Sequence, residues 1–414
     1  MRSRKPSPVA ACVLALAVAT PPLARAVEVQ PLWAARLLGG QYFFEGEKGT
    51  LSGNVSVLVA PALIFNDKWT LLPSLSSGYQ GTKQVVDLVG AGSLFQERMD
   101  HRVGAKLVHS PEGSRWRFKP EVRYKTELLK ETRDERWLKG LFDYQSVGAG
   151  VEAEYVFRDP FSVRAGYDYS YTFFPNYNSL ESSVALDFQG QPLARELVGD
   201  SILDAHIHMI TLAAGAPLGR RFEGETRLVF QRRSFGKQRV VESSGLLAGE
   251  TRRDFVTLLD ATVRLPAEMT PDWRLLASLT AGVANAVSNQ NSFDALRTRF
   301  FPSFYNYGEV HAGPRVALAI GDERQPVACS LGARFSYRRY PYRLVQDASG
   351  TYQASALHQT AWTVSATLSY PMAPRFSLLF DLQLGRASSN QGFEQFYSYN
   401  YSATSYLFGF SYDY

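Results

Sequence analysis

The sequence predicts an all-β fold, a transmembrane antiparallel β-barrel of about sixteen strands, with fourteen or eighteen strands also fitting the pattern. Three observations predict it. Apolar and polar residues alternate with a period of two along most of the chain. Short turns alternate with long connections, and a large aromatic residue follows most of the short turns. The strands must close into a barrel, because unpaired strand edges are not tolerated in hydrocarbon.

The first segment of the chain has the pattern of a secretory signal peptide. Basic residues in the first five positions precede an apolar run over residues 9–19, and Ala24-Arg25-Ala26 offers small residues for cleavage. The run is too short for a membrane-spanning helix, and no later stretch of about 20 apolar residues exists. We therefore predict a signal peptide at residues 1–26 and a single barrel domain at residues 27–414.

The predicted signal peptide explains most of the net charge of +5. It contains four of the 44 Lys and Arg residues and none of the 39 Asp and Glu residues, which leaves 40 basic against 39 acidic residues. A nearly neutral domain gives no support to nucleic-acid binding. Cys12 lies in the predicted signal peptide, so Cys329 is left without a partner for an internal disulfide.

Sixteen segments show the alternation expected of strands with one apolar face. Turn chemistry at the short connections, for example Asn66-Asp67-Lys68 and Thr270-Pro271-Asp272, separates neighbouring segments. The segments are centred near residues 34–44, 53–65, 69–80, 98–109, 116–127, 141–157, 161–174, 204–216, 221–234, 252–265, 273–288, 305–320, 327–340, 355–370, 375–387 and 397–414.

The remaining connections are long. In outer-membrane barrels, short turns face the periplasm and long loops face outward, so the alternation predicts the orientation of the strands. We expect the longest loop, 175–203, to cover the outer mouth rather than fold into the barrel. The long connections fall at about residues 81–97, 128–140, 175–203, 235–251, 289–304, 341–354 and 388–396.

Aromatic residues are placed where two interfacial belts are expected. Large rings settle at the level of the lipid headgroups, so a ring at the start of each strand indicates a periplasmic belt. The rings after short turns are Trp69, Trp116, Phe161, Phe222, Trp273 and Phe376, and the candidates for an outer belt are Tyr42, Phe43, Phe44, Tyr171, Phe173, Phe174, Phe304, Tyr305, Tyr307, Tyr340 and Tyr342.

Charged residues alternate with apolar ones most clearly from Trp116 to Leu128. A charge at the bilayer midplane costs a few kcal/mol, so the charged face is expected in the lumen. Two interpretations stay open: the charges create a field across a channel, or they form ion pairs that join neighbouring strands. The predicted pore-lining residues are Arg117, Lys119, Glu121, Arg123, Lys125, Glu127, Glu152, Glu154, Arg164, Asp168, Arg221, Glu223, Glu225 and Arg227.

The last nine residues carry a ring at every second position. This stretch resembles the closing strand of Gram-negative outer-membrane β-barrels, whose terminal aromatic residues are read by the barrel-assembly machinery. The resemblance implies an outer-membrane location, with outer-membrane lipid, lipopolysaccharide and the assembly machinery as partners. The predicted assembly signal consists of Tyr406, Phe408, Phe410, Tyr412 and Tyr414.

No motif in the chain predicts catalysis. Outer-membrane lipid hydrolases pair a strand His with a Ser two residues away, but the chain has His311-Ala312-Gly313 and His358-Gln359-Thr360. His206 and His208 share one face of a strand, and we interpret them as lumen-facing polar residues rather than metal ligands. The sequence therefore predicts no enzyme, no metal site and no cofactor.

The function that fits these patterns is a porin-like conduit for small polar solutes. The alternatives are a non-conducting barrel that anchors envelope-complex or motility proteins, and an export barrel for a polysaccharide or a similar substrate. Two interpretations stay open for basic residues in the outer loops: contacts with lipopolysaccharide phosphates or, more commonly, solvated loop charge. These residues are Lys237, Arg239, Arg252, Arg253, Arg297 and Arg299.

Overall fold

The fold was analysed in a computed structural model of the chain. It describes residues 27–88, 90–158, 161–177, 187–188, 191–192, 195–294, 297–323, 325–394 and 397–414. The predicted signal peptide, residues 1–26, and the predicted turn Asp159-Pro160 lie outside the described residues. Among the described residues, no helix has the length and apolar character that a membrane span needs.

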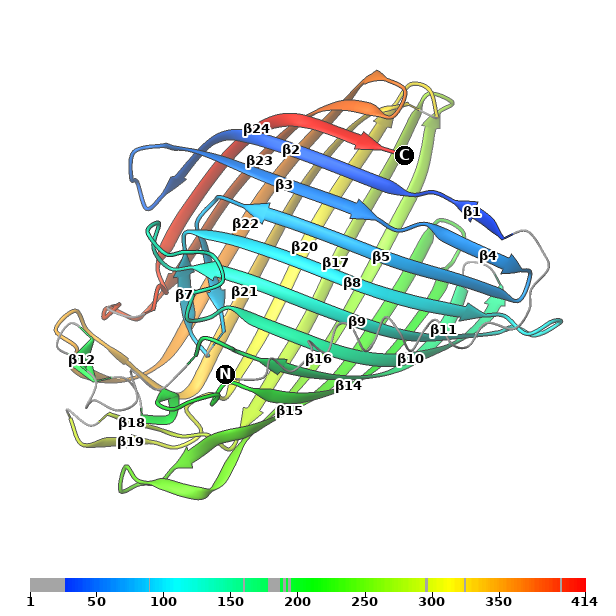
Figure 1. The fold of residues 1–414 in the computed structure, drawn as a ribbon. Helices are drawn as coiled ribbons and strands as arrows, with labels where there is room; N and C mark the ends of the chain where they lie inside the picture. Colours follow the sequence, from blue (N-terminus) through cyan, green and yellow to red (C-terminus); the bar gives the residue numbers. More distant parts are fainter. Residues whose placement is uncertain are drawn as a thin grey trace, which may run out of the picture.

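Sixteen antiparallel strands form the closed wall of a β-barrel, which confirms the predicted fold and strand number (Figure 1). The first and last wall strands pair with each other, for example Leu37 with Phe410, so the sheet has no free edge. The wall strands are β2 (Trp33–Phe44), β3 (Thr50–Val59), β5 (Trp69–Gln80), β8 (Glu97–His109), β9 (Trp116–Lys130), β10 (Tyr144–Arg158), β11 (Phe161–Phe173), β14 (Ala205–Leu218), β15 (Phe222–Val241), β16 (Leu247–Thr270), β17 (Trp273–Ser288), β20 (Tyr307–Ile320), β21 (Val327–Gln346), β22 (Tyr352–Ala373), β23 (Phe376–Ser389) and β24 (Tyr401–Asp413).

Two short strands continue the wall at one end. Strand β1 (Glu28–Gln30) pairs with β4 (Ala62–Asn66), and β4 pairs with β5. Pro31 separates β1 from β2, and Pro61 separates β3 from β4. Because proline cannot donate a hydrogen bond to a neighbouring strand, it interrupts the strand pairing. The chain nevertheless continues in the same direction after each proline. Strands β1 and β2 therefore form one wall strand with a local break, and β3 and β4 form another.

The short turns and the long loops lie at opposite ends of the barrel. Figure 1 shows the C-terminus at one end and the small strands β7, β12, β18 and β19 of the long loops at the other. The small elements are β6 (Gln84–Asp87), β7 (Gly92–Phe95), β12 (Asp187–Phe188), β13 (Gln191–Pro192), the 3₁₀ helix η1 (Arg195–Leu197), β18 (Ser292–Asp294) and β19 (Arg299–Phe301).

Apolar side chains cover the outside of the wall. Each of the six predicted periplasmic rings is the first residue of its strand, and Trp116 and Trp273 expose 45% and 43% of their surface. Rings at this level suit the boundary between hydrocarbon and headgroups. A closed wall with an apolar outer face is the architecture of barrels in the bacterial outer membrane, and it places the protein there.

The closing strand presents its aromatic stripe to the outside, as predicted. Phe408 exposes 63% of its surface, and Trp33 of β2 stacks on Tyr412 with ring centroids 4.5 Å apart. Two glycines, Gly40 and Gly409, allow the backbones to approach at this seam, because a Cβ on either would collide with the facing strand. The seam that closes the barrel is thus tight inside and aromatic outside.

Two of the predicted long loops are wrong, because their residues extend wall strands. Residues 235–251 belong mostly to β15 and β16, with a connection only at 242–246, and residues 341–354 belong mostly to β21 and β22. Bulges interrupt the register in both hairpins, but strand pairing continues as far as Val241 with Leu247. The hairpins therefore project beyond the wall at the outer end (Figure 1).

Candidate functional site: the lumen and its outer plug

The predicted ladder on β9 lies on the inner side of the wall. Trp116, Phe118 and Val122 are exposed on the outer face, so the charged residues that alternate with them, from Arg117 to Glu127, point inward. We call the inner faces of β8, β9, β10, β11, β15 and β16 the charged wall.

Ion pairs connect neighbouring strands of the charged wall. Lys119 Nζ on β9 lies 2.8 Å from carboxylate oxygens of both Glu152 and Glu154 on β10. Arg117 lies 3.8 Å from Glu154, and Ser162 on β11 donates a hydrogen bond to the same carboxylate at 2.8 Å. Lys119 and Arg117 thus balance the charges of two carboxylates that lie on the next strand.

The pairing continues on both sides of β9. Arg123 reaches over β10 to Asp168 on β11 at 2.5 Å. Glu121 pairs with Lys106 of β8 at 3.0 Å, and the buried Glu127 pairs with Arg98 of β8 at 2.9 Å and with Lys125. Arg98 and Lys106 were not predicted from the sequence, although charges at every second position of β8 are the same signal.

Glu225 joins the two ends of the charged wall. It accepts from Arg164 of β11 at 2.8 Å and from Arg264 of β16 at 2.7 Å, so it bridges three strands. The inner residues of the intervening β14 include Thr211 and Ala213, which leave room for this contact. Arg264 is a second residue that the sequence analysis missed.

The other predicted residues of this region are separate from the network. Glu223 and Arg227 lie on the inner face of β15, and neither has an ion-pair partner among the described residues. Arg221 lies in the exposed turn before β15, outside the strand. Among the described residues, Glu225 and the ladder residues on β9 to β11 therefore take part in ion pairs, whereas Glu223, Arg227 and Arg221 do not.

The opposite side of the lumen carries few charges. On β22, Thr363, Ser365, Thr367 and Ser369 alternate with outward residues such as Trp362. Strands β24, β3 and β5 likewise place mainly Ser, Thr, Ala, Gly and Asn inside, and β23 and β2 add larger residues such as Asp381 and Arg36. We call the inner faces of β22, β23, β24, β2, β3 and β5 the neutral wall.

A cavity of ≈ 800 Å³ lies inside the barrel near its periplasmic end. It is lined by side chains of both signs, including Arg36, Arg315 and Asp381, and by hydroxyls such as those of Ser330 and Thr367. Since a water molecule occupies about 30 Å³ in the liquid, the space is large enough for a hydrated small solute.

A hairpin crosses the outer part of the lumen. Strands β6 and β7 belong to the connection between β5 and β8, but Asp87 forms an ion pair with Arg338 of β21 at 2.9 Å. Arg338 also pairs with Glu309 of β20 at 2.7 Å. Because β21 lies on the far side of the barrel from β5 and β8, we call the described residues 84–88 and 90–95 the crossing hairpin.

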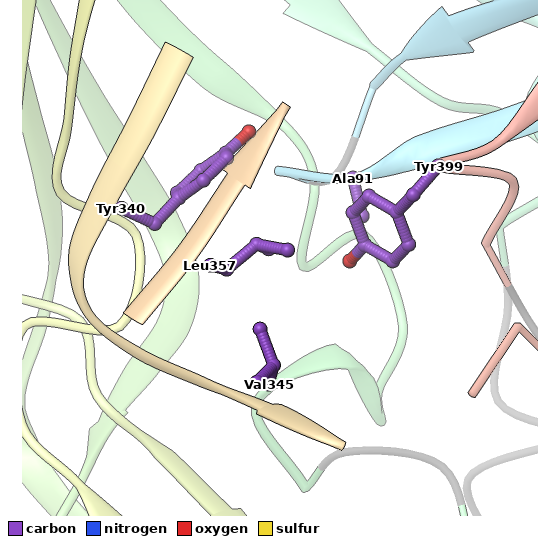
Figure 2. Close-up of a cluster of buried hydrophobic side chains, with 5 residues drawn as sticks. All are labelled: Ala91, Tyr340, Val345, Leu357 and Tyr399. Carbon is purple, nitrogen blue, oxygen red and sulfur yellow. The ribbon is translucent and has the colours of Figure 1, made fainter. Parts of the chain in front are cut away.

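A buried apolar cluster fixes the tip of the crossing hairpin. Ala91 packs with Tyr340, Val345 and Leu357 of β21 and β22 and with Tyr399 (Figure 2). The backbone N–H of Ser398 donates to Gly92 O at 2.8 Å, which joins the loop before β24 to the hairpin. We use the name outer plug for the segments packed at this end. They are the crossing hairpin, the described residues of the loops 175–203, 289–304 and 388–400, and the outer ends of the hairpins β15–β16 and β21–β22.

Arg343 is the central cation of the outer plug. It is 3% exposed, and its guanidinium donates to Gly90 O at 2.9 Å, to Phe304 O at 3.3 Å and to Tyr399 Oη at 3.3 Å. The same group lies 4.0 Å from the ring centroid of Phe304 and 4.2 Å from that of Tyr340. One side chain thus ties three loops to β21 through hydrogen bonds and cation–π contacts.

Glu196 is buried on the other side of the outer plug. Tyr305 donates to its carboxylate at 3.2 Å, and Gln238 of β15 donates to its backbone carbonyl at 2.8 Å. Burial raises the pKa of Glu196 above its usual range, because the charged form loses hydration. The described part of the loop 175–203 therefore packs into the outer plug through η1.

Five of the eleven residues predicted for the outer aromatic belt are wrongly placed. Tyr42, Phe44, Tyr305 and Tyr340 are buried, because they lie on the inward side of their strands or in loops packed over the lumen. Tyr307 likewise faces Tyr340 and Arg338. These rings build the outer plug rather than a belt. Arg252 is also buried and holds Asp254 through two 2.8 Å hydrogen bonds, so it is not a loop contact for lipopolysaccharide.

The histidine placements differ from the prediction. His206 and His208 face outward, where they bond with the hydroxyls of Tyr169 and Tyr167 at 2.8 Å each. Among the described residues, no group of three His, Cys, Asp or Glu side chains is arranged to hold a metal ion. Inside the barrel, His311 pairs with Asp260 at 2.9 Å across Gly282, where a larger residue would collide with both.

Comparison with known proteins gives structural matches alone. No family model matches the chain, and no curated protein matches it. The chain is similar to Acinetobacter baumannii OccAB1 (11% identity, 93% of this chain and 96% of that one, TM-score 0.47). It is also similar to Pseudomonas aeruginosa OccD3 (OpdP) (7%, 96% and 97%, 0.46) and to OmpT, an outer-membrane protein of Vibrio cholerae (12%, 94% and 100%, 0.46).

Proposed function

We propose that the protein is a porin-like conduit for small polar solutes across the outer membrane. The observation that carries the proposal is the cavity of ≈ 800 Å³ within the barrel, lined by hydroxyls and by charges of both signs. Binding sites for small molecules have about this volume. A lining of mixed sign favours polar and zwitterionic solutes over large apolar ones. A non-enzymatic role is part of the proposal.

The charged wall supports the same function. Most of its carboxylates and cations along β8 to β16 are held in ion pairs. These side chains therefore stay at the wall of the lumen and do not extend freely into the path of a solute. The neutral wall opposite offers hydroxyls that exchange hydrogen bonds with water and solute. A solute passing between them meets a fixed dipolar surface on one side and water-like partners on the other.

The outer plug favours a second function. Arg343 and the cluster around Ala91 pack the crossing hairpin against β21 and β22. A barrel whose outer lumen is packed in this way also suits a non-conducting anchor for other envelope proteins. Which function applies depends on whether the plug leaves or opens a path for solute.

Planar-bilayer recording on the purified, refolded barrel tests the proposal. Stepwise conductance, together with swelling of proteoliposomes in solutions of small sugars or amino acids, is the expected result. Folding is checked by the shift in gel mobility between heated and unheated samples. A folded sample that gives no conductance steps and no swelling, together with stoichiometric partners in a purification of the native barrel from membranes, would replace the conduit with the anchor.

A further inference from the structure

The outer face of β11, β14, β15 and β16 carries a basic patch in an otherwise apolar surface. It consists of His206, His208, Arg232 and Arg253, and all four belong to outward-facing positions. Phe230 and Phe255, which alternate with the arginines, are 44% and 51% exposed on the same face. Cations on the lipid side of a barrel are costly at the midplane, so they need a reason to lie there.

Strand register places the members of the patch side by side. His208 lies opposite Arg232 across β14 and β15, and Ser234 lies opposite Arg253 across β15 and β16. His206 and His208 each accept or donate one hydrogen bond with a tyrosine of β11, which fixes the rings. The patch is therefore a continuous surface over four strands.

The height of the patch corresponds to the outer headgroup region. Arg232 follows Phe222, the periplasmic ring of β15, by ten residues. At about 3.3 Å per residue this is roughly 33 Å along the strand. A strand tilt of about 40° reduces it to about 25 Å of height, which equals the apolar band of such barrels. Arg232 thus lies where phosphate groups of the outer leaflet are found.

The arginines of the patch have no ion pair among the residues that the structure describes. The guanidinium carbon of Arg232 lies 5.8 Å from the ring centroid of Phe255. The nearby carboxylate of Asp204 accepts instead from Tyr171 Oη at 3.3 Å and from Phe174 N at 2.8 Å. Above the patch, Lys237 lies 3.8 Å from Asp200.

The geometry points to a binding site for the phosphate groups of a phosphorylated glycolipid of the outer leaflet, such as lipid A. Two guanidiniums without partners match phosphate oxygens in charge and hydrogen-bonding geometry. The exposed Phe230, Phe255 and Tyr167 beside them contact the acyl chains. A second copy of this chain is the less favourable occupant, because it would bury both arginines without supplying an anion from this face. The site does not depend on conduction.

Native mass spectrometry of the folded full barrel tests this site. The double variant R232Q/R253Q is compared with wild type and with R315Q/R334Q, which removes two cations from the lumen side. Each protein is titrated with lipid A, with lipid A stripped of both phosphates, with phosphatidylglycerol and with inorganic phosphate. We expect R232Q/R253Q to bind lipid A about ten-fold more weakly, and R315Q/R334Q to bind it as wild type does.

Each other outcome overturns the inference. Equal lipid A binding by R232Q/R253Q and wild type, or equal binding of the dephosphorylated lipid, removes the phosphate contact. Competition by inorganic phosphate at millimolar concentration indicates a free-phosphate site, and equal binding of phosphatidylglycerol indicates a general anionic-lipid surface. A change in oligomer mass instead of lipid count indicates a chain–chain interface. The single variants R232Q and R253Q serve if the double variant does not fold.

Discussion

The charged wall and the neutral wall of the lumen are built on the same alternation but differ in how their inner residues are bonded. On the charged wall, side chains reach across one or two strands, as Lys119 does to Glu152 and Glu154. On the neutral wall, the hydroxyls of β22 are short, and a contact such as that of Thr367 with Asp381 at 3.4 Å reaches only the next strand. One wall is therefore cross-linked extensively through its side chains, whereas the other is held mainly by its backbone.

The difference bears on the two interpretations of the charge ladder. Ion pairing on β8 to β16 neutralises most of the ladder locally, which favours the interpretation that the ladder joins strands. The charges without described partners, such as Arg227 and Glu223, lie at the periplasmic end of the same wall. A field that acts on solutes would come from these residues and from the cations that line the cavity, Arg36 and Arg315.

The outer plug connects the two walls. Its crossing hairpin is fixed to β21 by Asp87–Arg338 and by Arg343, whereas Glu196 is held to β15 by Gln238. The largest expected effect is therefore on the plug. Replacing residues 84–95 by a short Gly-Ser linker removes the hairpin from the lumen and should raise single-channel conductance several-fold.

The control for this deletion is a Gly-Ser replacement of residues 45–48, the exposed turn between β2 and β3 at the same end of the barrel, where Glu47 N donates to Phe44 O at 2.9 Å. It should leave conductance near the wild-type value. If the hairpin deletion also leaves conductance unchanged in a folded barrel, the crossing hairpin does not limit the path.

The second prediction breaks the charged wall at Glu225. Glu225→Gln leaves Arg164 and Arg264 without their shared carboxylate, about one third exposed to the lumen. We expect the free energy of unfolding to fall by about 1–2 kcal/mol, between the values for buried and surface pairs. Urea titration in detergent, followed by tryptophan fluorescence, measures it.

Glu223→Gln is the matched control, because Glu223 lies two residues away on the same face without a described ion pair. It should change the free energy of unfolding by less than about 0.5 kcal/mol. Equal losses in the two variants would mean that the pairs around Glu225 contribute nothing beyond general lumen charge.

The sequence predicted the wall better than the plug, and the reason lies in the signals that each provides. A strand with one apolar and one charged face, such as β9, allows both its position in the chain and its inward side to be predicted from the sequence. Strand β14 does not: Ile207 and Met209 face inward, so its two faces are similarly apolar, and His206 and His208 were assigned to the wrong one. Period-two reasoning fixes a strand only when its faces differ.

The plug residues gave misleading signals for a physical reason. Tyr340 and Arg343 have the composition of an outer belt and a surface loop, but they are buried by segments far away in the sequence, around Gly90 and Tyr399. No local pattern specifies such contacts. The crossing hairpin was likewise predicted only as one of several long connections.

The third prediction concerns pH at the outer plug. Burial raises the pKa of Glu196, and it also raises the pKa of Asp143 and of Asp204 in neighbouring loops. An acid whose folded pKa is raised binds its proton more tightly in the packed state, so packing is favoured at low pH and weakened as pH rises through the folded pKa. The open probability in bilayers should therefore increase as the pH rises from the usual carboxylate range through the raised pKa of these groups.

Glu196→Gln removes the buried carboxylate while keeping the hydrogen bond from Tyr305. The variant should show a lower open probability at pH 8 and a shallower dependence on pH than wild type. An unchanged pH profile would assign the effect to Asp143 and Asp204 or to groups elsewhere in the barrel.

The smallest effect is expected on the neutral wall. Thr363 lies on the inner face of β22 without a side-chain hydrogen bond to another described residue. Thr363→Val keeps the shape of the side chain and should change the free energy of unfolding by less than about 0.5 kcal/mol, with conductance unchanged.

Thr363→Glu at the same position separates the two properties that the charged wall combines. The new carboxylate can remain hydrated in the lumen, so stability should again change little. The register partners of Thr363 are Arg334 of β21 and Gly385 of β23, so the new carboxylate meets one cation on β21 and none on β23 at this level. Reversal potentials in a KCl gradient should therefore shift toward cation selectivity, by less than for a fully isolated carboxylate. A large loss of stability instead would mean that this wall is packed rather than open to water.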